Sequence, residues 1–491
     1  MRLSHLVVVL PGIGGSVLQD PQSGEVVWSH GRSVLLEALR KPHVLRVDRP
    51  LQPIGLLQDI QIMPGWTAVP GYTALWNGLA GLPGAVADPG GTARRVAPFA
   101  NVIAFPYDFR RDIREAAGAL DRGVRNQLTS LGRPDESNSV IVVAHSMGGL
   151  VARYWIAKLG GHQVCRALMT LGTPHRGAPK ALDVWANGIP VGVGGFTRRL
   201  HGFSDQVRRW PSMAQLLPRY PCIQDPDIPG AGVHVRDLTR LSPAWTDLAE
   251  AGRFGWDFHK DIETGWAELA SPPAVRARVG FAQPTLQSAD VTPAGLAVTE
   301  LAPVWCDLGI QLCDAGDGTV PSISAFPLEF EDEPGFDPSL SQVPVTHGRI
   351  GNDLTVVGFI SRLEGWYHGR TGARGREGKV GLGVSVPEVN AAGHPVTVRV
   401  QLCGARPDSL PDQPVHVRIT STGDDAQQSA ARSVEPHTAA WDGETGQYVT
   451  QIEGLPEGIW TITASARAVP AVGDVTSSTD FIVVDLEEIE R

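Results

Sequence analysis

The sequence predicts an α/β fold with a doubly wound, mostly parallel sheet, followed by a smaller all-β region. Through the first part of the 491-residue chain, apolar β-branched runs alternate with segments of helical spacing, the pattern of a parallel sheet covered on both faces. From Val380 onward, short strand-like runs are separated by turn residues. A chain of this length exceeds what one core usually supports. We therefore expect an α/β domain over residues 1–368, a Gly- and Arg-rich linker over 369–379 and a β domain over 380–491.

The strands and helices of the α/β domain follow from local patterns. We expect strands where short runs are wholly apolar, and helices where apolar residues recur every three or four positions, as Leu120, Val124 and Leu128 do. The expected strands are His5–Leu10, Val102–Phe105, Val140–Val143, Cys165–Leu171 and Ala274–Gln283, and the expected helices are Arg114–Leu131, Leu150–Leu159 and Leu354–Leu363.

One stretch, Ser139–Val151, joins an expected strand to an expected helix through a tight turn of small residues. It reads SVIVVAHSMGGLV and has Ser146 at the apex of the turn. A serine between strand and helix forms a nucleophile elbow, whose usual pattern is G-x-S-x-G. Ala144 replaces the first glycine here, and both Ala144 and Gly148 must be small so that strand and helix can pass closely. The stretch predicts a nucleophilic serine in a strained backbone conformation; the alternative is an ordinary turn without chemistry.

The first expected strand runs directly into a glycine-rich loop, residues 11–16, which reads PGIGGS. Such a loop can cradle a phosphate, but neither G-x-G-x-x-G nor a following P-loop lysine is present. It can also present backbone N–H groups to a developing oxyanion. Because a nucleophile elbow follows in the same chain, we favour the oxyanion loop over a phosphate site or a plain turn.

A serine hydroxyl needs a base to remove its proton, and the base is normally a histidine oriented by a carboxylate. Around an elbow serine, the acid and then the histidine follow later in the chain. Asp317, in a Gly-Asp-Gly turn, and His347, on a glycine-containing loop, satisfy that order, with Asp314 as a rival acid. Three other histidines are set aside on position: His145 is adjacent to the serine and should point away from it, His175 precedes both acids, and His368 follows the last helix.

Residues 178–271 depart from the alternation of strand and helix. Strand patterns are absent, and tryptophans appear among Arg, Gly and Pro residues. An aromatic, glycine-containing insertion after a sheet strand is typical of a cap or lid over an active site. The alternative is a helical subdomain whose tryptophans belong to an ordinary core.

Composition limits the classes of partner and compartment. The net charge of −10 argues against nucleic acid as the main partner. Five scattered cysteines form neither a disulfide framework nor a zinc motif, and whether Cys306 and Cys313 pair stays open. Residues 1–5 lack the n-region of a signal peptide, and no stretch is long enough to span a bilayer. We therefore expect a cytoplasmic protein.

The C-terminal region is a series of short strands. About seven strands in about 110 residues are typical of an immunoglobulin-like sandwich. The clearest are Val396–Leu402, Val415–Ile419, Tyr448–Ile452, Ile459–Ala464 and Phe481–Val484. Because no catalytic constellation is found among them, we expect this domain to contact a membrane surface or a protein partner.

The α/β region resembles the lecithin:cholesterol acyltransferase family of α/β-hydrolases, which includes phospholipases and phospholipid acyltransferases. The matching motifs are residues 11–16, 70–72, 107–110, the serine elbow, 171–174 with Gly177, 316–320 and His347. The resemblance implies a triad of Ser146, Asp317 and His347, with oxyanion donors from the backbone of Ile13 and Met147. The chain departs from the family pattern in the alanine that opens the elbow and in a phenylalanine at position 109, where the family usually has tryptophan.

These observations together predict a serine esterase or lipase of the phospholipase or O-acyltransferase type. The serine attacks an ester carbonyl of a lipid or other carboxylic ester, the histidine relays the proton, and the aspartate stabilises the imidazolium. Water or a lipid alcohol then resolves the acyl-enzyme, and this chemistry needs neither a cofactor nor a metal. The alternative is a non-catalytic binding protein that keeps the α/β-hydrolase fold and docks a partner through its β-sandwich.

Overall fold

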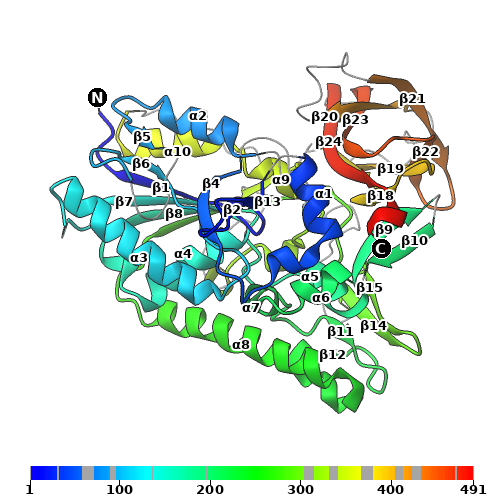
Figure 1. The fold of residues 1–491 in the computed structure, drawn as a ribbon, viewed down its shortest axis with the longest axis horizontal. Helices are drawn as coiled ribbons and strands as arrows, with labels where there is room; N and C mark the ends of the chain where they lie inside the picture. The colour runs from blue at the N-terminus through cyan, green and yellow to red at the C-terminus, as the bar shows by residue number, and fades with distance from the viewer. Residues whose placement is uncertain are drawn as a thin grey trace.

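The computed structural model describes residues 2–29, 32–57, 71–88, 96–134, 136–193, 196–200, 202–303, 315–330, 341–366, 380–403, 413–422, 433–469 and 473–489. Figure 1 shows an α/β part, coloured blue to yellow, beside a β part, coloured orange to red. The predicted combination of an α/β domain and a separate all-β region is confirmed, while the exact boundaries 368 and 380 stay a prediction, because residues 367–379 lie outside the described ranges.

The central sheet has the strand order β16–β13–β8–β7–β1–β6–β5. Its strands are β1 (Leu6–Leu10), β5 (Ala87–Asp88), β6 (Val102–Ala104), β7 (Val140–His145), β8 (Cys165–Leu171), β13 (Ala274–Gly280) and β16 (Gln342–Val343). All the pairings that join them are parallel. Later strands lie on both sides of β1, so the predicted doubly wound sheet is confirmed. All five predicted strands belong to it.

Helices cover both faces of this sheet. They include α2 (Thr73–Ala80), α3 (Ile113–Ser130), α4 (Met147–Lys158) and α10 (Thr355–Leu363). Residues Leu6, Val8 and Leu10 of β1 share a core with α3 and α4, whereas Val7 and Val9 share one with α2 and α10. Successive strand residues point to opposite faces, so an unbroken apolar run is what a sheet between two helical layers requires. Figure 1 shows α3 and α4 in front of the sheet.

The predicted insertion, residues 178–271, lies between β8 and β13. It contains α5 (Pro179–Asn187), β9 (Ile189–Val193), β10 (Phe196–Leu200), α6 (Gly202–Val207), α7 (Pro211–Gln215), β11 (Ile223–Gln224), β12 (Gly232–Val233), η3 (Val235–Arg240), η4 (Pro243–Trp245) and α8 (Thr246–Ala267). The expectation that it lacks strands is wrong. Its strands are short, and β10 carries the exposed polar side chains of Thr197 and Arg198, so the alternating pattern that marks a strand is weak there.

Helix α8 runs along the lower edge of the molecule (Figure 1) and packs on α4. The rings of Tyr154 in α4 and Phe258 in α8 stack with their centroids 5.7 Å apart. Part of the insertion is therefore a structural layer of the α/β domain rather than a movable cap.

Smaller elements flank these layers. One sheet has the order β3–β2–β4, with β2 (Ser16–Gln19), β3 (Val26–Trp28) and β4 (Gln52–Leu56), and another has the order β12–β11–β14–β15, with β14 (Ser288–Thr292) and β15 (Gly295–Thr299). The remaining helical elements are α1 (Arg32–Arg40), η1 (Pro42–Leu45), η2 (Gly161–Gln163), η6 (Ser322–Ser324), η7 (Leu328–Phe330), α9 (His347–Ile350) and α11 (Leu486–Ile489).

The C-terminal part is built on a sheet in the order β10–β9–β18–β24–β23–β20–β21–β22–β19–β17. Its own strands are β17 (Gly381–Ser385), β18 (Val389–Ala391), β19 (Val396–Cys403), β20 (Val415–Thr422), β21 (Ser433–Asp442), β22 (Gln447–Ile452), β23 (Gly458–Val469) and β24 (Gly473–Val484). Strands β9 and β10 come from the insertion, and β9 pairs in parallel with β18. Ile189 and Val191 of β9 share a core with Val389, Ile482 and Val484, so sheet and core continue from one part into the other.

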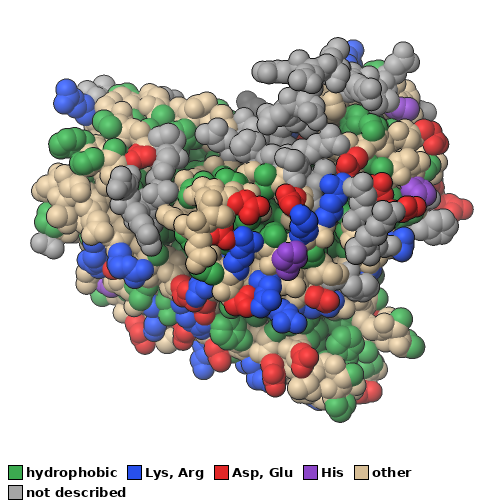
Figure 2. Space-filling view, in the orientation of Figure 1, with side chains coloured by type: hydrophobic (Ala, Val, Ile, Leu, Met, Phe, Trp, Pro, Cys, Tyr) green, Lys and Arg blue, Asp and Glu red, His purple; other side chains and the backbone are tan. Residues whose placement is uncertain are grey.

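One face of the molecule carries charged side chains of both signs (Figure 2). On the face drawn in Figure 2, basic and acidic side chains are interspersed rather than separated into fields of one sign. Within the described ranges, no helix is both long and apolar enough to cross a membrane.

Three of the five cysteines, Cys165, Cys222 and Cys403, lie in the interior and form no disulfide within the described residues. Cys165 and Cys222 are buried, and burial raises the pKa of each thiol to about 12. A thiol that stays protonated is a poor nucleophile. Cys306 and Cys313, whose pairing the sequence leaves open, lie outside the described residues.

Candidate active site

Ser146 lies at the sharp turn between β7 and α4. Its backbone has φ 50° and ψ −126°, and its N–H donates to the carbonyl of Leu171 at 2.8 Å. A non-glycine residue with positive φ is strained and persists only where its surroundings hold it. The elbow conformation expected from the sequence is therefore present at this serine.

Glycines next to the serine let three segments meet closely. A Cβ added to Gly12 would lie 2.8 Å from the Cβ of Ser146, and one added to Gly148 would lie 2.5 Å from the carbonyl oxygen of Pro11. Ala144 is fully buried and pairs on both sides within the sheet. The small residues expected at 144 and 148 are thus required by the packing of strand and helix.

His347 meets the serine from the other side. It is the first residue of the short helix α9, where the sequence predicts a loop. Its Nε2 lies 2.9 Å from the Oγ of Ser146, and its Nδ1 lies 2.8 Å from the Oδ2 of Asp317. A carboxylate only accepts, so Nδ1 carries the proton and Nε2 is free to accept one from the serine. The structure thus brings the three residues selected from the sequence into one hydrogen-bonded chain.

Asp317 is held through both of its carboxylate oxygens and its backbone. Oδ1 accepts from the backbone N–H groups of Thr319 at 3.0 Å and Val320 at 2.7 Å, while Oδ2 faces His347. The backbone N–H of His347 donates to the carbonyl of Asp317 at 2.8 Å. A Cβ on Gly280 would lie 2.4 Å from the Asp317 Cβ, so the acid loop rests directly on the end of β13. The rival, Asp314, lies outside the described residues.

His145 points away from the serine, as expected, and joins a second network. Its Nε2 lies 3.0 Å from the carbonyl of His347, and its Nδ1 lies 2.9 Å from the hydroxyl of Tyr72. The carbonyl only accepts, so Nε2 carries the proton and Nδ1 accepts from the tyrosine. That hydroxyl in turn accepts from the N–H of Gly12 at 2.8 Å. Burial, and secondarily the neighbouring His347, lowers the pKa of His145 to about 3, so this ring is neutral near pH 7.

Tyr72 is the participant to which sequence reasoning gave no role. It lies next to α2, in a motif that contributed only to the family resemblance, and its side chain is buried. Burial raises the pKa of its phenol well above the usual range, so the hydroxyl remains a donor. The network connects the glycine-rich loop to the backbone of His347. It could not be predicted from the sequence, because these segments come together only in the folded structure.

Two backbone N–H groups near the serine are available to a ligand. Met147 is the first residue of α4, where backbone N–H groups lack intrahelical acceptors. Ile13 follows Gly12 in the glycine-rich loop. Among the described residues, no protein atom accepts a hydrogen bond from the N–H of Ile13 or of Met147. They are the two groups that the family resemblance implies as oxyanion donors.

The site is closed to solvent. Ser146 is 1% exposed, Asp317 1% and His347 3%.

Other histidines do not join this chain. His175 is buried, with its Nε2 3.3 Å from the Oγ1 of Thr170. Burial lowers its pKa well below the ordinary value. His368 lies outside the described residues. The described residues also contain no group of three or more His, Cys, Asp or Glu side chains arranged to hold a metal ion.

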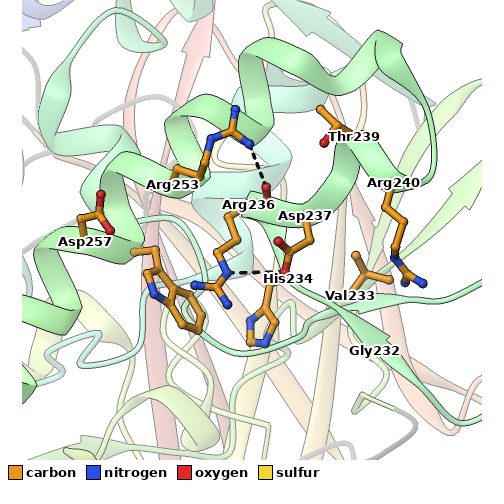
Figure 3. Close-up of a pocket in the computed structure, with 10 residues that line it drawn as sticks. Gly232, Val233, His234, Arg236, Asp237, Thr239, Arg240, Arg253 and Asp257 are labelled. Atoms are coloured by element: carbon orange, nitrogen blue, oxygen red, sulfur yellow. Dashed lines mark hydrogen bonds and ion pairs between the residues drawn. The ribbon is translucent and has the colours of Figure 1, made fainter.

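A cavity of about 770 Å³ lies elsewhere, between η3 and α8 (Figure 3), and none of the three residues of the hydrogen-bonded chain lines it. Two of its arginines are ion-paired: Arg236 lies 3.4 Å from Asp237, and Arg240 lies 2.5 Å from Asp225, which does not line the cavity. The guanidinium of Arg236 also lies over the ring of Trp256, 3.3 Å from its centroid.

Part of the chain is similar to a known α/β family. Residues 118–194, which include β7, the serine elbow, α4 and β8, match the family described as PGAP1-like alpha/beta domain. The matched range does not reach Asp317 or His347, so it supports the nucleophile side of the site.

Two curated relatives are lipid enzymes. The chain is 31% identical to "Lysosomal phospholipase A and acyltransferase" of Bos taurus over 206 residues, 38% of this chain and 45% of that protein. It is 37% identical to "Triacylglycerol lipase 2" of Saccharomyces cerevisiae over 79 residues, 15% of this chain and 24% of that protein. The match thus spans less than half of either relative. The resemblance to lipase- and phospholipase-type α/β-hydrolases predicted from the sequence is confirmed.

Solved structures add little to this picture. The superoxide reductase (neelaredoxin) of Ignicoccus hospitalis matches 21% of this chain and 80% of its own at 10% identity, with a TM-score of 0.16. A similarity at this level supports no argument about the fold or the function of the chain.

Proposed function

We propose that this protein is a serine hydrolase that cleaves or transfers the acyl group of a lipid or other carboxylic ester, with Ser146, His347 and Asp317 as its triad. One observation carries the proposal, the chain of hydrogen bonds from the serine Oγ through His347 to Asp317, at 2.9 and 2.8 Å. The positive φ of Ser146 supports it independently, because strain of this kind is typical of functional sites.

The reaction follows from these contacts. His347 Nε2 takes the proton of the serine hydroxyl as Oγ attacks the ester carbonyl, and Asp317 stabilises the resulting imidazolium. The protonated His347 then donates this proton to the departing alcohol, which leaves the acyl group on Ser146. Water, or a lipid alcohol, attacks the acyl-enzyme with His347 again as base, and the acyl group leaves as an acid or a new ester.

The oxyanion would be stabilised by the N–H groups of Ile13 and Met147. Donors that are fixed before the reaction stabilise developing charge without reorganisation. The Tyr72–His145 network supports this arrangement by holding Gly12, the residue before Ile13, against the elbow.

A lipid ester is the substrate class we favour. The two curated relatives are named as a phospholipase and acyltransferase and as a triacylglycerol lipase. The nearly complete burial of the serine is consistent with a cap that opens at a lipid surface. We expect hydrolysis of an aggregated ester to exceed that of the same ester below its critical aggregation concentration.

We also propose a fold for the β part and a cellular compartment for the protein. An immunoglobulin-like sandwich is supported by the apolar core that strands of both halves of the sheet share, among them β17, β19, β23 and β24. Cytoplasmic localisation and contact of this part with a membrane or protein partner stay predictions from the sequence.

Covalent labelling tests the nucleophile directly. A fluorophosphonate probe should label the native protein, and Ser146→Ala should abolish both labelling and hydrolysis of p-nitrophenyl butyrate without lowering the melting temperature. Ser130→Ala is the matched control, since Ser130 is an exposed serine at the end of α3, and it should label like the native protein. His347→Ala should be almost as severe as Ser146→Ala, because triad residues act as a unit.

Two results would contradict the proposal. Labelling that survives Ser146→Ala would mean that another residue is the nucleophile. Absence of labelling and of ester turnover in the folded native protein would favour the alternative, a binding protein that keeps the hydrolase fold without its chemistry.

A further inference from the structure

The acid loop is tied on both sides of Asp317 to a single residue, Gln283. The backbone N–H of Gln283 donates to the carbonyl of Gly316 at 3.1 Å. The carbonyl of Gln283 accepts from the hydroxyl of Thr285 at 2.8 Å, and that hydroxyl accepts from the N–H of Gly318 at 2.8 Å. The position of the carboxylate therefore depends on where the backbone of Gln283 lies.

The side chain of Gln283 is hydrogen-bonded to the β part of the molecule. It is 1% exposed, its Nε2 donates to the carbonyl of Leu382 at 3.0 Å, and its Oε1 accepts from the N–H of Val384 at 3.2 Å. Both partners lie in β17, the last strand of its sheet. An amide has a donor and an acceptor, as a peptide group does. The amide of Gln283 thus bonds to the backbone of β17 as a peptide group would, and it links β17 to the α/β part.

The packing around this link is tight and strained. Ala282 has φ 67° and is fully buried. A Cβ on Gly383 of β17 would lie 2.6 Å from the carbonyl oxygen of Ala282, and one on Gly381 would lie 2.9 Å from the Ala282 Cβ. A strained buried residue persists only where its neighbours hold it, and here β17 is one of those neighbours.

The histidine side of the site has a similar support. Arg349, two residues after His347, donates from Nε to the carbonyl of Ser478 in β24 at 3.1 Å. The acid loop is therefore linked to the C-terminal sheet through Gln283, and the helix that carries His347 contacts this sheet directly through Arg349.

We propose that the C-terminal β part is a support for the catalytic acid, and that Gln283 is the positioning residue through which it acts. The inference rests on the proposed function, since it assigns the acid role to Asp317. It differs from the expectation of a docking domain, because it makes the β part a component of the active site. A small displacement of a catalytic group lowers the rate of the chemical step more than it lowers substrate affinity.

The first test separates kcat from KM. Gln283→Ala should lower kcat for p-nitrophenyl butyrate by about 10- to 100-fold with KM within about twofold. Gln283→Met, which keeps the volume of the side chain, should show the same loss of kcat. It replaces the alanine variant in the test if that variant does not fold. Gln287→Ala is the matched control, because Gln287 is also buried but donates to the carbonyl of Glu300. It should lower the melting temperature to a similar extent with kcat within about twofold.

The second test needs no catalysis. Hydrogen exchange of the peptide covering residues 315–330 should accelerate in Gln283→Ala and Gln283→Met and remain unchanged in Gln287→Ala, since the N–H groups of Thr319 and Val320 are held by Asp317. Unchanged exchange, or folded Gln283 variants with native kcat, would overturn the inference. If the native protein were inactive, the proposed function would fail while the exchange experiment still decided the coupling.

Discussion

The serine and the acid of this site are held in different ways. Ser146 is fixed by its own neighbourhood: the strand before it, the helix after it and glycines that allow close approach. Asp317 has local support from the N–H groups of Thr319 and Val320. Its loop is also held by residues distant in sequence, namely Gly280, Gln283 and Thr285, and through Gln283 by a strand about one hundred residues further on. We therefore infer that the position of the serine depends mainly on local structure, and that of the aspartate also on contacts distant in sequence.

This difference predicts that substitutions near the serine and substitutions near the acid disturb the site in different ways. Substitutions that disturb the elbow should act through the packing of the α/β core. Substitutions in the β part, which contains no member of the triad, should act on the acid and the base. Four changes test this contrast, and the first of them should have the greatest effect.

Removal of the β part should have the largest effect. A chain that ends at Trp366 would lack the partners of Ile189 and Val191, both fully buried in the whole protein, and would lack the support of Gln283. We expect it to be insoluble or to melt far below the whole chain, because buried apolar surface becomes exposed. Soluble expression, thermal melting and p-nitrophenyl butyrate hydrolysis of the two chains, measured in parallel, provide the check. A soluble, fully active truncation would show that the acid needs no support from the β part.

Exchange of the acid for an amide should have the next largest effect. Asp317→Asn should lower kcat by about 10⁴-fold, since the amide no longer favours the correct histidine tautomer, with the melting temperature little changed. Asp314→Asn, the matched control in the same segment, should lower kcat only a few-fold. Equal losses in kcat would mean that Asp317 is not the acid or that both residues are structural.

The elbow itself can be tested with a single methyl group. Gly148→Ala should lower the free energy of unfolding by about 2–3 kcal/mol, because the added Cβ meets the carbonyl oxygen of Pro11 at 2.5 Å. Gly118→Ala in α3 should raise it by about 0.5–1 kcal/mol, since its Cβ would meet only the Arg122 guanidinium at 3.6 Å. Urea unfolding of both variants measures these changes, and a neutral Gly148→Ala would contradict the close packing of the elbow.

Acid pH should weaken the fold gradually. Burial lowers the pKa of His145 to about 3 and of His259 to about 4, from 6.5. Below pH 6.5 the unfolded chain takes up protons that the folded chain does not, so stability that is complete above pH 6.5 is lost as pH falls. The expected slope is about 1.4 kcal/mol per pH unit for each histidine.

A variant pair checks the origin of this slope. His259→Gln should reduce the fall in the free energy of unfolding between about pH 7 and 4.5. His43→Gln, at an exposed position, should leave it unchanged. Identical slopes in the two variants and the native protein would mean that other groups dominate acid unfolding.

Local sequence patterns were sufficient to predict the central sheet and the elbow serine, our proposed nucleophile. Runs such as Leu6–Leu10 and Cys165–Leu171 can be recognised because a strand buried on both faces must be apolar throughout. The elbow can be recognised because its strained serine and close packing require small residues at fixed positions next to it. Asp317 and His347 followed from their order in the chain, which is a property of the sheet's connectivity.

The contacts that hold the proposed acid and base could not be predicted from the sequence. Gln283 carries no local signal, since a buried glutamine is recognised only by the strand that binds its amide. The pairing of β9 with β18 was equally hidden, because its two strands are short and lie far apart in sequence. Strand partners of this kind are selected by long-range packing of both faces and edges, which no local periodicity records.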